Sequence, residues 1–127
     1  EYYFYELEKL NFFQLPFKHQ SIIHGYQSYP CIFNKGNLDN KNIISINKDR
    51  NIFMENLQQD GVSTRPATHA VHMLDYYKRK YKIEPMDFPN AYIANECSIS
   101  FPLFNGLSNV EQSYVVKKIK SNLKCAV

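Results

Sequence analysis

Side chains able to bind a charged ligand are concentrated between Gly61 and His72, where the sequence reads Gly-Val-Ser-Thr-Arg-Pro-Ala-Thr-His-Ala-Val-His. The guanidinium of Arg65 carries a planar set of donors that matches a carboxylate or a diphosphate. The imidazoles of His69 and His72 can donate or accept hydrogen bonds near neutral pH. Residue types of this kind, grouped in twelve consecutive positions, predict a binding function for the stretch.

Other interpretations of the same residues stay open. Arg65 can form a surface ion pair, and the two histidines can cap or line a helix. His69 and His72 are three positions apart, so a helix would place both on one side, a spacing that permits metal ligation. Two ligands without a nearby Cys, His or Asp set do not complete a four-coordinate site. We therefore predict no metal site and no catalytic residue in this chain.

The stretch is predicted to connect two helices. The first is expected over Asp49–Gln59 with Asp49 as its cap, and Gly61 fits the left-handed position that follows a helix end. Val62–Arg65 should then be extended, and Thr68 is predicted to cap a second helix over Ala70–Tyr81. Polar side chains in a short connection held by packed elements are well placed to bind ligands.

The other elements predict a single α+β domain over residues 1–127. Alternating apolar residues predict strands over 28–34 and 98–101, and the isoleucines at 43, 44 and 46 predict a further short strand. The simplest architecture is a small, mainly antiparallel sheet of three or four strands, flanked by helices on one face. The remaining expected features are helices over 2–10, 87–96 and 108–123, a loop over 35–42, inward-facing Ile52, Phe53 and Leu57, and a capping box at Ser108 and Glu111.

Composition excludes several classes of function. The 127 residues are 44% hydrophobic and 21% charged, as in ordinary globular domains, and the net charge of +3 is spread along the chain without the basic stripe of nucleic-acid binders. No apolar run approaches the ~20 residues of a membrane span. Phosphate-binding loops, dinucleotide fingerprints and G-x-S-x-G motifs do not occur. The three cysteines, Cys31, Cys97 and Cys125, lack a C-x-x-C pair and favour a reducing, cytoplasmic location.

Several motifs, taken in order, resemble the C-terminal domain of the DegT/DnrJ/EryC1/StrS aminotransferases. These enzymes use pyridoxal phosphate to place an amino group on nucleotide-linked keto-sugars. The pattern Arg-Pro-x-Thr-His-x-x-His is similar to perosamine-synthase-type members. The motifs that carry the resemblance are Gly61–Pro66, Thr68–His72 with Tyr76 and Tyr77, Asp87–Ala91, Ser98–Phe104, Leu107 and Ser108 with Glu111 and Gln112, and Val115–Ile119.

The resemblance implies a function for the longer protein and a limited role for this chain. It implies a homodimeric aminotransferase that binds pyridoxal phosphate, a nucleotide-sugar and an amino-acid donor. No segment matches the family's Schiff-base lysine motif, so this chain corresponds to the small domain and is expected to be inactive and unable to hold the cofactor alone. Arg65, Thr68, His69 and His72 become the expected substrate-binding residues. The alternative is a non-catalytic regulatory or interaction module derived from the family.

Overall fold

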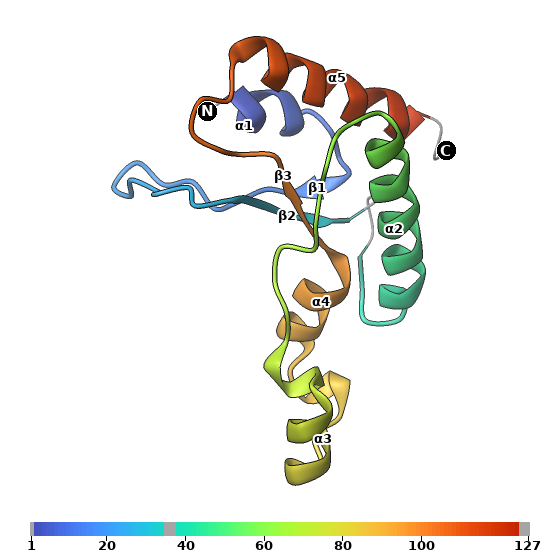
Figure 1. Ribbon diagram of the computed structural model, residues 1–127. Helices are drawn as coiled ribbons and strands as arrows, with labels where there is room; N and C mark the ends of the chain where they lie inside the picture. Colours follow the sequence, from blue (N-terminus) through green and yellow to red (C-terminus); the bar gives the residue numbers. More distant parts are fainter. Residues whose placement is uncertain (1, 35–37, 125–127) are drawn as a thin grey trace.

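The computed structural model describes residues 2–34 and 38–124 (Figure 1). Its centre is an antiparallel sheet of three strands in the order β1-β2-β3: β1 is Phe13–Gln14, β2 is Tyr29–Phe33 and β3 is Ser98–Phe101. The α+β fold with a small antiparallel sheet is therefore confirmed. Cys125 and residues 35–37 of the predicted loop lie outside the described residues.

Helices supply the rest of the regular structure. In the described part of the chain, no helix combines the length and the apolar character needed to cross a membrane. The α-helices are α1 (Tyr2–Leu7), α2 (Ile43–Gln59), α3 (Asp75–Tyr81), α4 (Pro89–Cys97) and α5 (Asn109–Lys124), and two short 3-10 helices are η1 (Val71–Met73) and η2 (Pro85–Asp87).

One face of the sheet builds an aromatic core. In β2, Tyr29, Cys31 and Phe33 are buried while the two residues between them are only half-buried, as the predicted alternation requires. Phe33 packs against Phe53 of α2, with ring centroids 5.4 Å apart. Helices α1, α2 and α5 close over this face, since their apolar side chains belong to the same buried cluster. Arg65 pairs with Ser100 through an isolated antiparallel bridge, so the chain after Gly61 meets the sheet at the edge of β3 that does not pair with β2.

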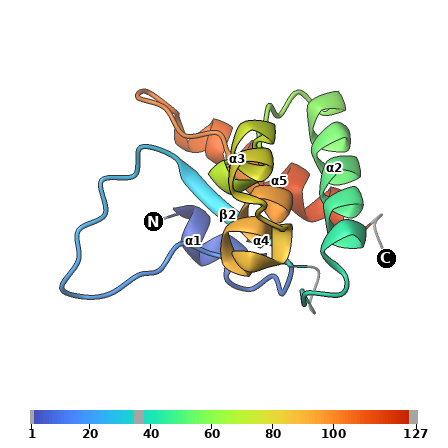
Figure 2. The same ribbon diagram turned by 90° about the horizontal axis from the view of Figure 1, so that it is seen from below.

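Two parts of the chain project from this body. Residues 15–27 form an open loop that extends away from the helices in Figure 2, and the side chain of Ile23 in this loop is fully exposed. On another side, η1, α3 and η2 form a narrow stem below α4 in Figure 1. No residue of α3 is buried, so the stem contributes little to the core.

Helix α2 corrects two sequence predictions. Ile43, Ile44 and Ile46 form its first turn rather than a strand, and Asp49 lies inside the helix rather than capping it. Ile43 and Ile46 are both buried, so packing against the sheet outweighs the strand preference of their branched side chains. Ile52 points to solvent, whereas Phe53 and Leu57 are buried as predicted.

The local signals at helix ends were more reliable. Gly61 has a positive φ of 76°, the left-handed conformation expected after α2. The capping box before α5 is also confirmed, because the Ser108 N–H donates to Glu111 Oε2 at 2.8 Å and the Glu111 N–H donates to Ser108 Oγ at 3.2 Å. Thr68, in contrast, does not cap a helix: the predicted helix over residues 70–81 is divided into η1 and α3, and neither has a side-chain cap.

Asp60, at the end of α2, joins that helix to α5. Its carboxylate accepts hydrogen bonds from Lys118 Nζ at 2.6 Å and from Asn122 Nδ2 at 2.8 Å. Its carbonyl oxygen accepts a further bond from the Tyr114 hydroxyl at 2.8 Å. The hydrogen bonds from Lys118 and Asn122 hold the pKa of Asp60 below its ordinary value, since both stabilise the ionised carboxylate.

A neutral replacement of Asp60 should reveal this contribution through pH. A depressed pKa stabilises the folded state above the unfolded pKa, and the effect is lost as pH falls through the folded pKa. We expect Asp60→Asn to lower the melting temperature at pH 7 and the gap to wild type to close below roughly pH 4. Asp75→Asn removes the same formal charge from the exposed helix α3, and its melting temperature should match that of wild type at every pH. A gap for Asp60→Asn that persists unchanged into acid would contradict the assignment.

Candidate functional site

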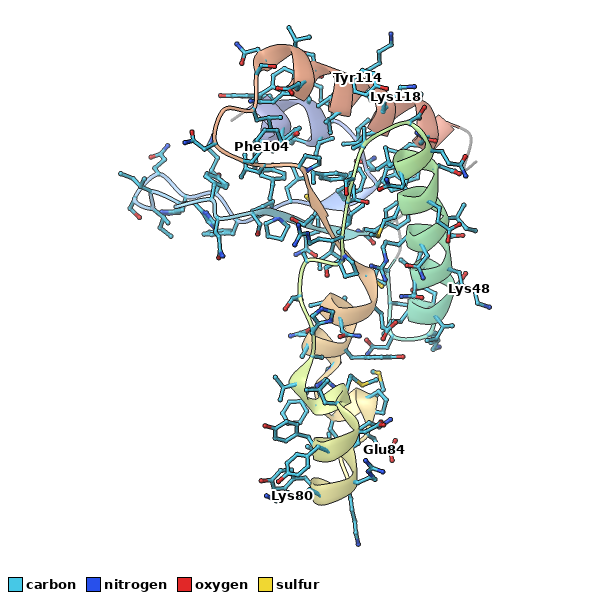
Figure 3. The ribbon with its side chains drawn as sticks, in the orientation of Figure 1. Lys48, Lys80, Glu84, Phe104, Tyr114 and Lys118 are labelled. Carbon is cyan, nitrogen blue, oxygen red and sulfur yellow. The ribbon has the colours of Figure 1, made fainter. Side chains whose placement is uncertain are left out.

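A hollow beside the predicted binding stretch has a volume of about 660 Å³ and lies between three segments. Residues 61–65 form one wall, Ser100 of β3 and residues 102–107 after that strand form the second, and the first turns of α5 form the third. Figure 3 labels one residue of each of the last two walls, Phe104 on the segment after β3 and Tyr114 on α5. The hollow thus depends on segments about forty positions apart in the sequence, which the sheet brings together.

The walls of the hollow are apolar with a polar edge. The apolar residues include Phe104 and Tyr114, which are 56% and 46% exposed and therefore offer aromatic surface to a ligand. The polar edge comes from residues 63–65, with Ser100 opposite and Glu111 on α5. The remaining apolar residues of the lining are Val62, Pro102, Leu103, Leu107, Val110 and Val115.

Arg65 is the only cationic side chain among the described residues that line this hollow. Its backbone is fixed, because the Ser100 N–H donates to the Arg65 carbonyl at 2.8 Å and the Arg65 N–H donates to the Ser100 carbonyl at 3.5 Å. Its side chain is exposed and has no hydrogen-bond or ion-pair partner among residues 2–34 and 38–124. The open interpretation of Arg65 as half of a surface ion pair therefore finds no partner in that part of the chain.

Arg65 also borders a second, smaller hollow. This space has a volume of about 360 Å³ and is lined on its other side by Gln27 and Ser28, at the base of the projecting loop. Ser100 and Leu103 line both hollows together with Arg65. The guanidinium is thus available to a ligand in either space.

The carboxylate of Glu111 does not neutralise Arg65. Glu111 Oε2 instead accepts bonds from the hydroxyl of Ser108 at 2.7 Å and from its N–H at 2.8 Å, and these bonds hold the pKa of Glu111 below its usual range. Thr64, between Ser63 and Arg65, has a buried hydroxyl without a hydrogen-bond partner in the described structure. Buried polar groups are nearly always paired, so this hydroxyl is a candidate contact for a bound ligand.

The other three predicted binding residues are not gathered around the same space. Thr68 lines a separate hollow with Pro30 and Ala94, and His69 is exposed. His72 is buried at the top of the stem, where its ring lies 5.2 Å from that of Phe88. Its Nε2 is 3.2 Å from the Pro85 carbonyl oxygen. This environment favours packing for His72, the alternative that the sequence left open, and the binding roles of Thr68 and His69 stay predictions.

Most of the residues that line the hollow could not be predicted from the sequence. Ser63 and Thr64 belong to the stretch first noted, so their polar character was a usable signal. Phe104 ends a motif that carried the family resemblance, but nothing in the sequence placed it opposite Arg65. For Tyr114 no signal existed, because its position on α5 matters only once that helix is packed above residues 61–65.

Comparisons with known proteins agree on one family. A model of the DegT/DnrJ/EryC1/StrS aminotransferase family matches residues 1–120. The uncharacterized protein MJ1066 of Methanocaldococcus jannaschii is 25% identical over 115 residues, which are 91% of this chain and 28% of that protein.

Solved structures share the fold at low identity. The Streptococcus pneumoniae sugar aminotransferase Spr1654, in its pyridoxamine-phosphate form, matches with a TM-score of 0.79 and 17% identity over 98% of this chain and 29% of its own. Sugar aminotransferase CalS13 of Micromonospora echinospora matches with a TM-score of 0.70 and 18% identity, over 94% of this chain and 28% of its own. Helicobacter pylori PseC, an aminotransferase involved in the biosynthesis of pseudaminic acid, matches with a TM-score of 0.74 and 11% identity, over 97% of this chain and 30% of its own. The chain spans less than a third of the length of these relatives.

Proposed function

The chain belongs to the DegT/DnrJ/EryC1/StrS aminotransferase family, and on this premise we propose that it is the C-terminal portion of a pyridoxal-phosphate enzyme. The proposed reaction moves an amino group from an amino-acid donor to a nucleotide-linked keto-sugar. The resemblance of the Arg65–His72 pattern to perosamine synthases supports that branch of the family. We also propose a homodimer, as implied by the same resemblance.

The observation that carries this proposal is the unpaired Arg65 at the edge of a hollow with aromatic and apolar walls. A nucleotide-linked sugar combines a diphosphate with a flat base and polar sugar rings, and an amino-acid donor carries a carboxylate. Arginine is well shaped for both anions, because its guanidinium can bond two oxygens at once. Pro66 restricts the backbone next to Arg65, which reduces the conformational entropy lost when a ligand binds.

The described residues around Arg65 do not fit a covalent attachment of the cofactor. Among residues 2–34 and 38–124, no lysine lines the hollow beside Arg65, and the carboxylate of Glu111 there accepts a hydrogen bond from Ser108. Pyridoxal phosphate, when bound, supplies the electron sink for moving the amino group. We therefore assign this chain the binding and orientation of the substrate, and assign the cofactor to the part of the relatives that this chain does not span.

Amino transfer by the full-length protein tests the proposal. Purified protein supplied with pyridoxal phosphate and an isotopically labelled amino acid should transfer the label to a nucleotide-linked keto-sugar, detected as a labelled amino sugar by mass spectrometry. Omitting the keto-sugar is the control and should leave no labelled sugar product. If the full-length protein carries no Schiff-base lysine and transfers no label, the non-catalytic module becomes the correct interpretation.

A further inference from the structure

The binding segment, residues 65–70, has almost no regular structure of its own. It makes a single isolated bridge through Arg65, and η1 begins only at Val71. Pro66 has no N–H, so it adds no backbone donor. The place of the Arg65 guanidinium in the protein therefore depends on this bridge and on what holds the few amides that follow.

Two side chains from one short stretch hold these amides. The Ala67 N–H donates to Ser98 Oγ at 3.0 Å, and the Ala70 N–H donates to Asn95 Oδ1 at 2.9 Å. Together with the bridge at Ser100, all three attachments come from residues 95–100 at the junction of α4 and β3. Side-chain oxygens thus replace the carbonyl acceptors that a regular strand would have provided.

The two anchoring residues are in turn tied to α2. The Arg50 side chain, only 4% exposed, donates through Nη1 to the Ser98 carbonyl oxygen at 3.1 Å. Asn95 Nδ2 donates to Glu96 Oε1 at 2.9 Å, and the other carboxylate oxygen of Glu96 accepts a bond from Asn47 Nδ2 at 2.9 Å. A continuous set of hydrogen bonds therefore runs from α2, through the junction, to the segment that carries Arg65.

We propose that Asn95 and Ser98 are positioning residues that fix residues 65–70, and through them the Arg65 guanidinium, for substrate binding. The substrate part of this inference rests on the proposed function, whereas the anchoring of the two amides does not. Asn95 is the sharper test, because its Oδ1 and Nδ2 connect the binding segment directly to the network of α2. If the segment is less firmly held, the Arg65 side chain samples more positions and binds substrate more weakly. No group that touches substrate is removed by this change.

Amide exchange in the full-length protein tests the anchor. In Asn95→Ala, we expect exchange in peptides spanning residues 66–72 to become about tenfold faster, while α5 peptides keep their wild-type rates. Asn95→Asp retains an Oδ1 acceptor but sets a second carboxylate against Glu96 Oε1, so Ala70 should be protected less than in wild type and more than in Asn95→Ala. Asn90→Ala is the matched control, since Asn90 is an exposed residue of the same helix without a side-chain hydrogen bond in the described structure. Unchanged exchange in Asn95→Ala would overturn the proposal, whatever the enzyme does.

Kinetics of the same full-length variants test the positioning role. Asn95→Ala should raise KM about fivefold for the substrate that Arg65 binds and leave kcat within about twofold. Combining it with Arg65→Lys should cost less than the product of the two single effects, because both weaken one contact. An unchanged KM beside a defective Arg65→Lys would overturn the positioning role and leave the proposed function intact. A silent Arg65→Lys would overturn the substrate role of Arg65 and with it the positioning role, whereas the proposed reaction is tested by amino transfer itself.

Discussion

Replacing Phe53 by alanine is expected to destabilise this domain by about 3–5 kcal/mol, the range seen when a buried aromatic side chain is removed. Phe53 is 2% exposed and links two parts of the core. Its ring centroid lies 5.4 Å from that of Phe33 in β2 and 6.0 Å from that of Phe13 in β1. Truncation removes these contacts and leaves a cavity between α2 and the sheet that the strands cannot close without losing their pairing.

Chemical denaturation of this domain measures the effect. Ile52→Ala is the matched control, because Ile52 is the neighbouring residue of the same helix and is 55% exposed. Alanine favours helices, so both variants should keep α2, and the control should lose less than about 1 kcal/mol. Equal destabilisation by the two variants would contradict the packing described for α2.

Features set by neighbouring residues could be predicted from the sequence. The alternation in residues 29–33, the positive φ of Gly61 and the capping box at Ser108 each depend on only a few consecutive positions, and all three are confirmed. The order of the expected elements favoured a small antiparallel sheet with helices, and the family resemblance implied the same architecture, which the structure confirms.

Features set by distant contacts could not be predicted in the same way. Ile43 and Ile46 have a local preference for strands, but both are buried on the inner face of α2, and this burial stabilises the helix. Thr68 has the right residue type for a cap, yet it caps no helix. The Ala67 N–H before it bonds to Ser98, 31 positions away from Ala67, and the Ala70 N–H after it bonds to Asn95, 25 positions away from Ala70. No pattern near Thr68 contains that information.

In the candidate site, too, local features could be predicted from the sequence and features set by distant contacts could not. Arg65 could be selected by its chemistry and by its place after a helix end. Its lack of an ion-pair partner in the described chain, and the wall formed by Phe104 and Tyr114, appear only once α5 is packed beside residues 61–65. The ring of His72 is buried against Phe88 and Pro85, which agrees with the packing role that the sequence left open, and its binding role stays a prediction.

Arg65→Lys is expected to lower kcat/KM of the full-length enzyme about tenfold or more. Lysine keeps the positive charge but loses the planar fork that can bond two anionic oxygens. A charge-assisted contact of this kind contributes on the order of 1.5–3 kcal/mol, and each ~1.4 kcal/mol corresponds to a factor of ten. A surface arginine without a bound anion contributes at most ~1 kcal/mol, so its replacement by lysine would be nearly silent.

The measurement that tests the substrate role of Arg65 most directly is kcat/KM of Arg65→Lys, determined separately for the amino donor and for the nucleotide-linked keto-sugar. Arg79→Lys is the matched control, because Arg79 is exposed on α3 and distant in sequence from the residues that line the hollow. Thermal melting should show that both variants fold like wild type. We expect at least one of the two values to fall about tenfold in Arg65→Lys and neither to change in Arg79→Lys, and the value that falls identifies the substrate that Arg65 binds. If both values for Arg65→Lys stay within about twofold of wild type, Arg65 does not bind substrate and the proposed site is wrong.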